Sequence, residues 1–331
     1  MTTHEKTPRR AIVAAWIACA AIAPAAPPAS AQQAYPAKPV RLVSPSSAGG
    51  GTDIIARVLA PKLAERLGQQ VIVENRPGAG TVIGIDYVAK AAPDGYTLLL
   101  GLSTLATSPA LFKKLPYDAE RDLAPIAQVA ASPNVLVVHP SVPVASVREL
   151  IAFTRTRPGQ LTYGSAGIGT NPHMTMALFL SMTKLDMVHV SYKGSAPAVT
   201  ALLGGHVAAM SATAITGLPH VRSGRLRGLG VTSAKRSAVA PELPTLAEAG
   251  VPGYEATQWY GVLAPAGTAR ELIMRLHGEL TRILQLADVK SRFAADGVEV
   301  VIDTPEQFGK YIRAEIVKWA KVAREAQIKQ E

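Results

Sequence analysis

Two short glycine-bearing loops, each between a strand-like and a helix-like segment, constrain this chain more than any other feature. They lie at 44–53 and 163–172, and each ends in residues that suit a helix start, Asp53 in the first and Asn171-Pro172 in the second. Such a loop presents unpaired backbone N–H groups and the positive end of a helix dipole, which together favour an anion. Neither loop contains Lys or Arg. The pair predicts two lobes that close on a small carboxylate.

The alternation of strand-like and helix-like segments predicts α/β layering around a largely parallel sheet. Strands are expected at 39–44, 71–74, 97–100, 129–138, 187–190, 207–211 and 226–232, and helices at 53–67, 81–91, 197–203, 269–285, 304–331 and from 172 onward. Pro61 predicts a kink or break in the first helix. Ser146 with Glu149 three residues later is a capping-box pattern that predicts a helix start. The strand at 226–232 is expected to return the chain to the first lobe.

The first 31 residues have the pattern of a secretory signal peptide. A basic segment at 6–10 precedes an apolar run at 11–23, and Ala-Ser-Ala at 29–31 is a cleavage site. The apolar run is shorter than the roughly 20 residues of a membrane span. A retained anchor and lipid attachment at Cys19 stay open as alternatives. We expect a periplasmic protein cleaved near Ala31, which leaves a cysteine-free chain long enough for two domains.

The sequence contains no catalytic or metal motif of useful specificity. H-E-x-x-H, G-x-S-x-G and G-x-x-x-x-G-K-[ST] are missing, and no two histidines have metal-ligand spacing. The segment 78–84 superficially resembles a dinucleotide fingerprint, but its glycine spacing is wrong, so a turn or a rim of the cleft is the better interpretation. Neither a cofactor nor a metal is predicted.

The formal net charge is +10, and the bases are scattered along the chain. The densest group, at 222–227, has no aromatic neighbours on which bases would stack. We therefore expect no nucleic-acid partner, and a solvated basic surface that mildly attracts anions.

The ligand contacts are expected from the two loops, because glycines let backbone amides approach a carboxylate closely and hydroxyls add donors. Asp53 cannot itself receive a carboxylate, so we expect it to cap its helix or to accept from a ligand ammonium or a water. For His173, a ligand contact and a packing role are both open. The predicted ligand-binding residues are Ser46, Ala48, Gly49, Gly50, Asp53, Thr104, Ser165, Ala166, Gly169, Thr170 and His173.

Several segments in order along the chain resemble the tripartite tricarboxylate transporter substrate-binding proteins, the Bug receptor family. The matching segments are Pro39-Val40-Arg41, Gly50 with Asp53, Val73 to Gly80, Pro93 to Leu98, Leu115 to Asp118, Tyr163 to Gly167, Tyr192-Lys193-Gly194, Pro244 to Gly250 and Trp259 to Pro265. The resemblance implies a periplasmic type II binding-protein fold, with two α/β lobes joined by two crossing strands. The expected lobes are 32–138 with 233–331, and 139–232.

The resemblance also implies that the two loops hold a ligand carboxylate through backbone amides, hydroxyls and ordered water. The implied partners are membrane transporter subunits or a sensor kinase, and the receptor is expected to be a monomer and not an enzyme. The alternative is an exported enzyme on the same scaffold that uses Ser165 with His173. The chain departs from its relatives at 205–212, where it lacks their acids, and at 46–48, where it has Ser-Ser-Ala in place of the common proline and glycine. The resemblance therefore does not identify the acid that is bound.

Overall fold

The computed structural model describes residues 1–4, 35–325 and 328. The chain divides into two units, Met1–Tyr35 and Pro36–Glu331, and the second contains the folded elements described below. Most of the predicted signal peptide, including Cys19 and the cleavage site, lies outside the described residues. In the part of the chain that is described, no helix has the length and apolar character needed to cross a membrane.

The first lobe is built on one half of a ten-stranded sheet, in the order β2-β1-β3-β9-β4, where β4 is Leu123–Val138. Its strands are β1 (Val40–Ser44), β2 (Val71–Asn75), β3 (Thr97–Leu102) and β9 (Thr257–Pro265), with β10 (Glu299–Val300) paired to β4. Its helices are α1 (Gly51–Leu67), α2 (Val82–Ala89), α3 (Thr104–Leu111), α8 (Arg270–Gln285), α9 (Ala287–Ala295) and α10 (Pro305–Glu325), with a 3-10 turn at Ala79–Thr81. β1, β2 and β3 are parallel, as the sequence predicts, whereas β9 runs antiparallel to β3.

The second lobe continues the sheet in the order β4-β7-β5-β6, with β8 also paired to β4. Its strands are β5 (Thr162–Ser165), β6 (Val188–Ser191), β7 (Ala209–Thr213) and β8 (Arg227–Val231). Its helices are α4 (Val147–Arg155), α5 (Asn171–Thr183), α6 (Ser195–Leu203) and α7 (Ala214–Arg222). The Ser146 hydroxyl accepts the Glu149 N–H at 3.2 Å at the start of α4, which confirms the predicted cap.

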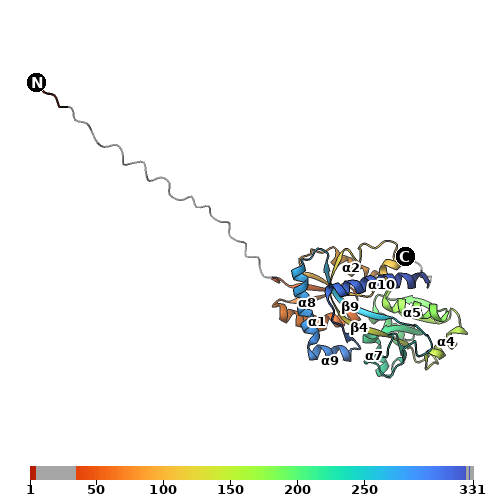
Figure 1. Ribbon diagram of the computed structural model, residues 1–331. Helices are drawn as coiled ribbons and strands as arrows, with labels where there is room; N and C mark the ends of the chain where they lie inside the picture. The colour runs from red at the N-terminus through yellow and green to blue at the C-terminus, as the bar shows by residue number, and fades with distance from the viewer. Residues whose placement is uncertain (5–34, 326–327, 329–331) are drawn as a thin grey trace. The chain divides into compact units, whose positions relative to one another are not determined.

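The long strand β4 (Leu123–Val138) belongs to both lobes. It pairs with β9 as far as Pro133 and Thr257, and from Asn134 onward it pairs with β7 and β8. In Figure 1, β4 and β9 run side by side between the lobe with α1, α8 and α9 and the lobe with α4, α5 and α7. The predicted α/β fold with two lobes and crossing strands is therefore present.

Two local predictions were wrong. The strand predicted at 226–232 does not return to the first lobe, because β8 pairs with the second-lobe part of β4, and the return is made by β9. The predicted break at Pro61 does not occur, since α1 continues as one helix across it. Pro61 lies on the exposed side of α1, while Leu59 and Leu63 are buried, so packing of the apolar face holds the helix together.

The helix α10 covers the crossing strands. Phe308 meets Trp259 of β9 edge to face with ring centroids 5.5 Å apart, and Trp319 is fully buried. The Trp319 indole N–H donates to the buried Glu315 carboxylate at 2.8 Å, so the polar atom of this large side chain is satisfied. The contact of Phe308 with Trp259 packs α10 against β9, which supplies the floor of the cavity described next.

Candidate functional site

A cavity of about 340 Å³ lies where the two lobes face each other. The first lobe contributes the loop after β1, the start of α1 and the turn 77–81. The second lobe contributes 166–168, the start of α5, 191–195 and Thr213, and β9 contributes Gln258 and Tyr260. The cavity therefore has walls from both lobes and a floor from a crossing strand.

Four helices begin at this cavity: α1, α5, α6 and α7. Residues at or next to their first turns line it, namely Gly51 and Thr52, Asn171 and Pro172, Ser195, and Thr213. None of the four has a side chain capping its N-terminus. The first N–H groups of a helix have no partner inside the helix, and they carry the positive end of its dipole. The cavity is thus surrounded by unsatisfied donors of partial positive charge.

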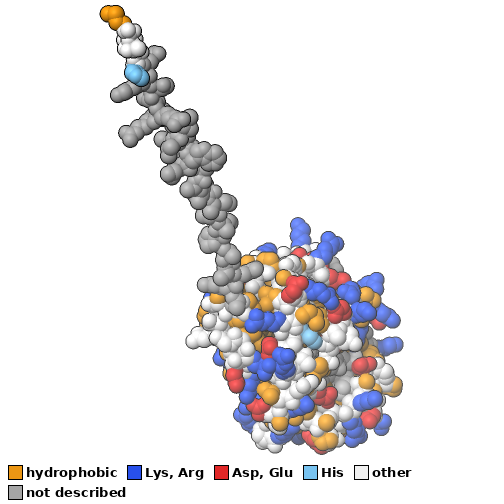
Figure 2. Space-filling view, turned by 60° about the vertical axis from the view of Figure 1, so that its left-hand side comes forward, with side chains coloured by type: hydrophobic (Ala, Val, Ile, Leu, Met, Phe, Trp, Pro, Cys, Tyr) orange, Lys and Arg blue, Asp and Glu red, His pale blue; other side chains and the backbone are white. Residues whose placement is uncertain are grey.

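The charges of the cavity lining agree with this polarity. Among the described residues that line it, none is Asp or Glu, and the single base is Lys193, which is exposed. The hydroxyls of Ser47 and Thr52 and the side-chain carbonyl of Asn171 are buried without a hydrogen-bond partner. On the face drawn in Figure 2, Lys and Arg side chains lie among Asp and Glu side chains. Buried polar groups are normally satisfied, so these three atoms favour a polar occupant.

The lobes touch each other in the lining of the cavity, through glycines. A Cβ on Gly80 would overlap the carbonyl oxygen of Ile168, and a Cβ on Gly194 would overlap the hydroxyl of Ser47. Both glycines have positive φ, +60° and +119°. The Thr107 hydroxyl of α3 also donates to the carbonyl of Gly169 in the second loop. The structure therefore has the lobes closed, in an arrangement in which a Cβ on Gly80 would meet backbone and a Cβ on Gly194 would require the Ser47 side chain to move.

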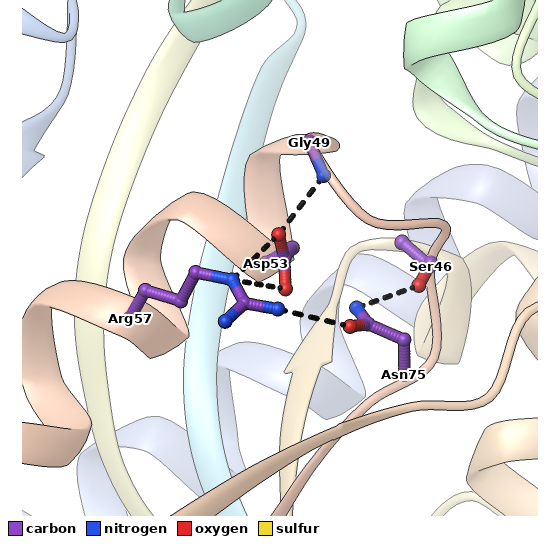
Figure 3. A network of polar contacts seen from close by, with 5 residues as sticks. All are labelled: Ser46, Gly49, Asp53, Arg57 and Asn75. Atoms are coloured by element: carbon purple, nitrogen blue, oxygen red, sulfur yellow. Dashed lines mark hydrogen bonds and ion pairs between the residues drawn. The ribbon is translucent and has the colours of Figure 1, made fainter.

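A polar network supports the first loop from the side away from the second lobe (Figure 3). The Asp53 carboxylate accepts the Gly49 N–H at 2.9 Å and the Arg57 Nε–H at 3.0 Å. Asn75 accepts from Arg57 at 3.4 Å and donates to the Ser46 carbonyl at 3.1 Å. Burial acts to raise the pKa of the Asp53 carboxyl, but the bonds from Arg57 and Gly49 outweigh it and hold that pKa below its usual range. Asp53 is ionised and engaged with the loop.

Two stacked histidines support the second loop. The rings of His173 and His189 stack with centroids 4.2 Å apart, and Tyr163 stacks on His189 at 4.9 Å. The Gly169 N–H donates to His173 Nδ1 at 3.1 Å, and Ser165 Oγ lies 2.7 Å from His189 Nε2. Burial, aided by His189, lowers the pKa of His173 to about 3, and burial lowers that of His189 to about 4. Both imidazoles are neutral near pH 7, and the partner of Ser165 is His189, not His173.

The eleven residues predicted to bind ligand fall into two groups. Ser46, Ala166 and Thr170 line the cavity. The other eight do not: Asp53, Gly49, Ser165, Gly169 and His173 make the loop contacts described above, and Gly50 is the residue before α1. Ala48 is exposed. The Thr104 hydroxyl lies 2.6 Å from that of Thr81, which does line the cavity.

Sequence reasoning missed the floor of the cavity. Gln258 and Tyr260 lie on β9, which was not predicted as a strand, and Thr213 ends β7 without a glycine to mark it. The turn at 78–81 was interpreted as a turn or a rim of the cleft, and it does line the cavity.

Two α/β lobes closed over a cavity, with strands crossing between them, define a periplasmic-type solute-binding protein. The family model described as tripartite tricarboxylate transporter family receptor matches residues 55–328. The chain belongs to this family of solute-binding receptors.

Known relatives are similar over nearly the whole length. Protein BugT of Bordetella pertussis is 43% identical over 317 residues, covering 95% of this chain and 96% of BugT. The structure of R. palustris Rpa4515 with adipate has a TM-score of 0.87 at 37% identity, covering 90% of this chain and all of that one. MatC from Rhodopseudomonas palustris with bound malate has a TM-score of 0.84 at 31% identity, covering 87% and 99%.

Proposed function

We propose that this protein is an exported periplasmic receptor that captures a small organic carboxylate and presents it to the membrane subunits of a tripartite transporter or to a sensor system. The observation that carries the proposal is the convergence of four uncapped helix N-termini on a cavity whose described lining contains no acid. Solved relatives with adipate and with malate support the ligand class. The lack of a lining acid favours a ligand without an ammonium group.

Capture works by closure of the two lobes. Amides at the starts of α1 and α5 come from different lobes, so a carboxylate contacts both sets at once only in the closed form. A ligand that binds the closed form more tightly shifts the population toward it. Ser46 and Thr170 line opposite walls of the cavity and add hydroxyls there. Gly49, Gly50 and Gly169 act through the shape of the loops rather than through a side chain.

Titration calorimetry with adipate, malate and benzoate, each compared with its amide, tests the proposal. We expect at least one acid to bind, and its amide to bind at least about 100-fold more weakly, because hydrogen bonds to charged groups are worth about twice those to neutral ones and several are lost together. Equal binding of acid and amide would refute the role of charge.

We propose that the receptor does not transform its ligand. Ser165, the nucleophile of the alternative enzyme hypothesis, is fully buried, accepts the Gly167 N–H at 3.2 Å, and is not among the residues that line the cavity. In the same calorimetry samples, the acid recovered after incubation is expected to be chemically unchanged. Turnover that disappears in Ser165→Ala would instead favour an enzyme.

Replacing Thr52 by valine is expected to weaken binding of the preferred acid by about tenfold, the usual worth of a hydrogen bond to a charged group. The Thr52 hydroxyl is buried at the cavity without a protein partner, so its loss should leave the melting temperature unchanged or slightly higher. Calorimetry and thermal unfolding measure the two effects. A loss of stability with unchanged affinity would show that this hydroxyl does not contact the ligand.

A further inference from the structure

Arg57 lies outside the cavity lining, but it forms an ion pair with Asp53, the acid that directly follows the lining residue Thr52. We propose that Arg57 neutralises the Asp53 carboxylate, which would otherwise repel a ligand carboxylate from the N-terminus of α1. This inference rests on the proposed function of the cavity as a carboxylate site.

An acid at this position is a problem for an anion site. Asp53 is the third residue of α1 and directly follows Thr52, which lines the cavity. Its side chain is only 4% exposed, so water screens its charge poorly. Its carboxylate also competes with a ligand for the positive end of the helix dipole. Left alone, the Asp53 charge would oppose the donors at the start of α1.

The counter-charge to Asp53 is Arg57, which lies outside the cavity lining. Arg57 lies one turn further along α1, and its Nε is 3.0 Å from both carboxylate oxygens of Asp53. Within residues 35–325, no other base forms an ion pair with Asp53. The Arg57 side chain is 57% exposed and is held at its far end by Asn75, so it faces solvent and β2 rather than the cavity (Figure 3). Arg57 therefore acts on the site through Asp53, as a positioning residue.

A competing interpretation is that the network only braces the loop. The two interpretations predict different effects of Asp53→Asn on ligand affinity. Asparagine retains an oxygen that accepts the Gly49 N–H but removes the negative charge. A brace would be weakened by losing either partner of the ion pair. Charge neutralisation predicts that removing the arginine weakens anion binding, whereas removing the aspartate charge does not.

The test measures the dissociation constant of the full-length mature protein for whichever of adipate, malate and benzoate the wild type binds best. Arg57→Gln is expected to weaken binding by about tenfold, the effect of one poorly screened charge at a helix end. Asp53→Asn is expected to bind as tightly as the wild type or more tightly. The double variant is expected to return to within about threefold of the wild type, since the unpaired charge is gone. Thermal unfolding of each variant separates affinity from folding.

Arg292→Gln is the matched control. Arg292 Nε lies 2.7 Å from Asp296 Oδ2 in a pair with the same i,i+4 spacing at the end of α9, which does not line the cavity. This variant changes the net charge by the same amount, so it should leave binding unchanged. Three outcomes would overturn this inference while leaving the proposed function intact. In the first, Arg57→Gln does not weaken binding, and in the second, it weakens binding no more than Arg292→Gln does. The third outcome is that Arg57→Gln, Asp53→Asn and the double variant all weaken binding. A wild type that binds none of the acids would overturn the proposed function first.

Discussion

Replacing Gly80 by alanine is expected to weaken carboxylate binding at least about 100-fold, a loss of about 2.7 kcal/mol, while the protein stays folded. A Cβ at this position would overlap the carbonyl oxygen of Ile168 in the opposite lobe. That oxygen belongs to the backbone, so no side-chain rotation relieves the clash. The lobes would have to stay apart, and a ligand would lose the contacts of one lobe.

Gly68→Ala is the control for the backbone effect. Gly68 ends α1 with φ +71°, close to the +60° of Gly80, but nothing lies within 4 Å of a Cβ placed there. Both variants should lose about 1 kcal/mol of stability from the left-handed conformation. Only Gly80→Ala should lose binding in calorimetry and the ligand-induced decrease in radius of gyration in small-angle scattering. Wild-type affinity in Gly80→Ala would show that closure does not depend on this contact.

Acidification is expected to destabilise the wild-type protein through His173. The folded-state pKa of His173 is about 3, far below the ordinary 6.5, because the imidazole is buried beside His189. The unfolded chain therefore binds a proton that the folded chain does not. Above pH 6.5 neither state binds this proton, so the contribution of His173 to the free energy of unfolding is fully present. That contribution is lost as the pH falls toward 3, because the unfolded state becomes protonated first. Between pH 7 and pH 4, His173 should remove about 3 kcal/mol from the free energy of unfolding.

Urea unfolding at several pH values, compared with that of His173→Gln, isolates this effect from that of the carboxylates. Glutamine does not titrate, so the variant should show a dependence on pH that is shallower by about 3 kcal/mol over the same range. If the His173 variant had the wild-type dependence, the buried imidazole would not be the cause.

The sequence predicted the parts of the fold that have local signals. The loop at 44–53 and the loop at 163–172 were found because glycine next to a helix start is visible in the sequence, and both do flank the cavity. The capping pair Ser146 and Glu149 was found for the same reason.

The features that the sequence did not predict depend on distant contacts. The pairing of Leu263 with Leu99 makes 257–265 a strand. The contact of Ser165 with His189 joins residues of two neighbouring strands, and no local pattern distinguishes it from one with His173. Asp53 was expected at a helix start, and its i,i+4 ion pair with Arg57 is a local pattern that was overlooked. The bridge through Asn75, in contrast, depends on how β2 lies against α1.

The sharing of β4 between the two lobes sets an order for folding as the chain emerges. The second-lobe strands pair with one another and with β4 using residues from Asn134 to Val231. The first-lobe sheet is incomplete until residues 257–265 arrive, because β9 separates β3 from β4. One side of β3 therefore stays unpaired until β9 is available, and such long-range pairing is slow. If the protein is exported as we propose, this edge of β3 remains exposed until the carboxyl-terminal third of the chain has crossed the membrane.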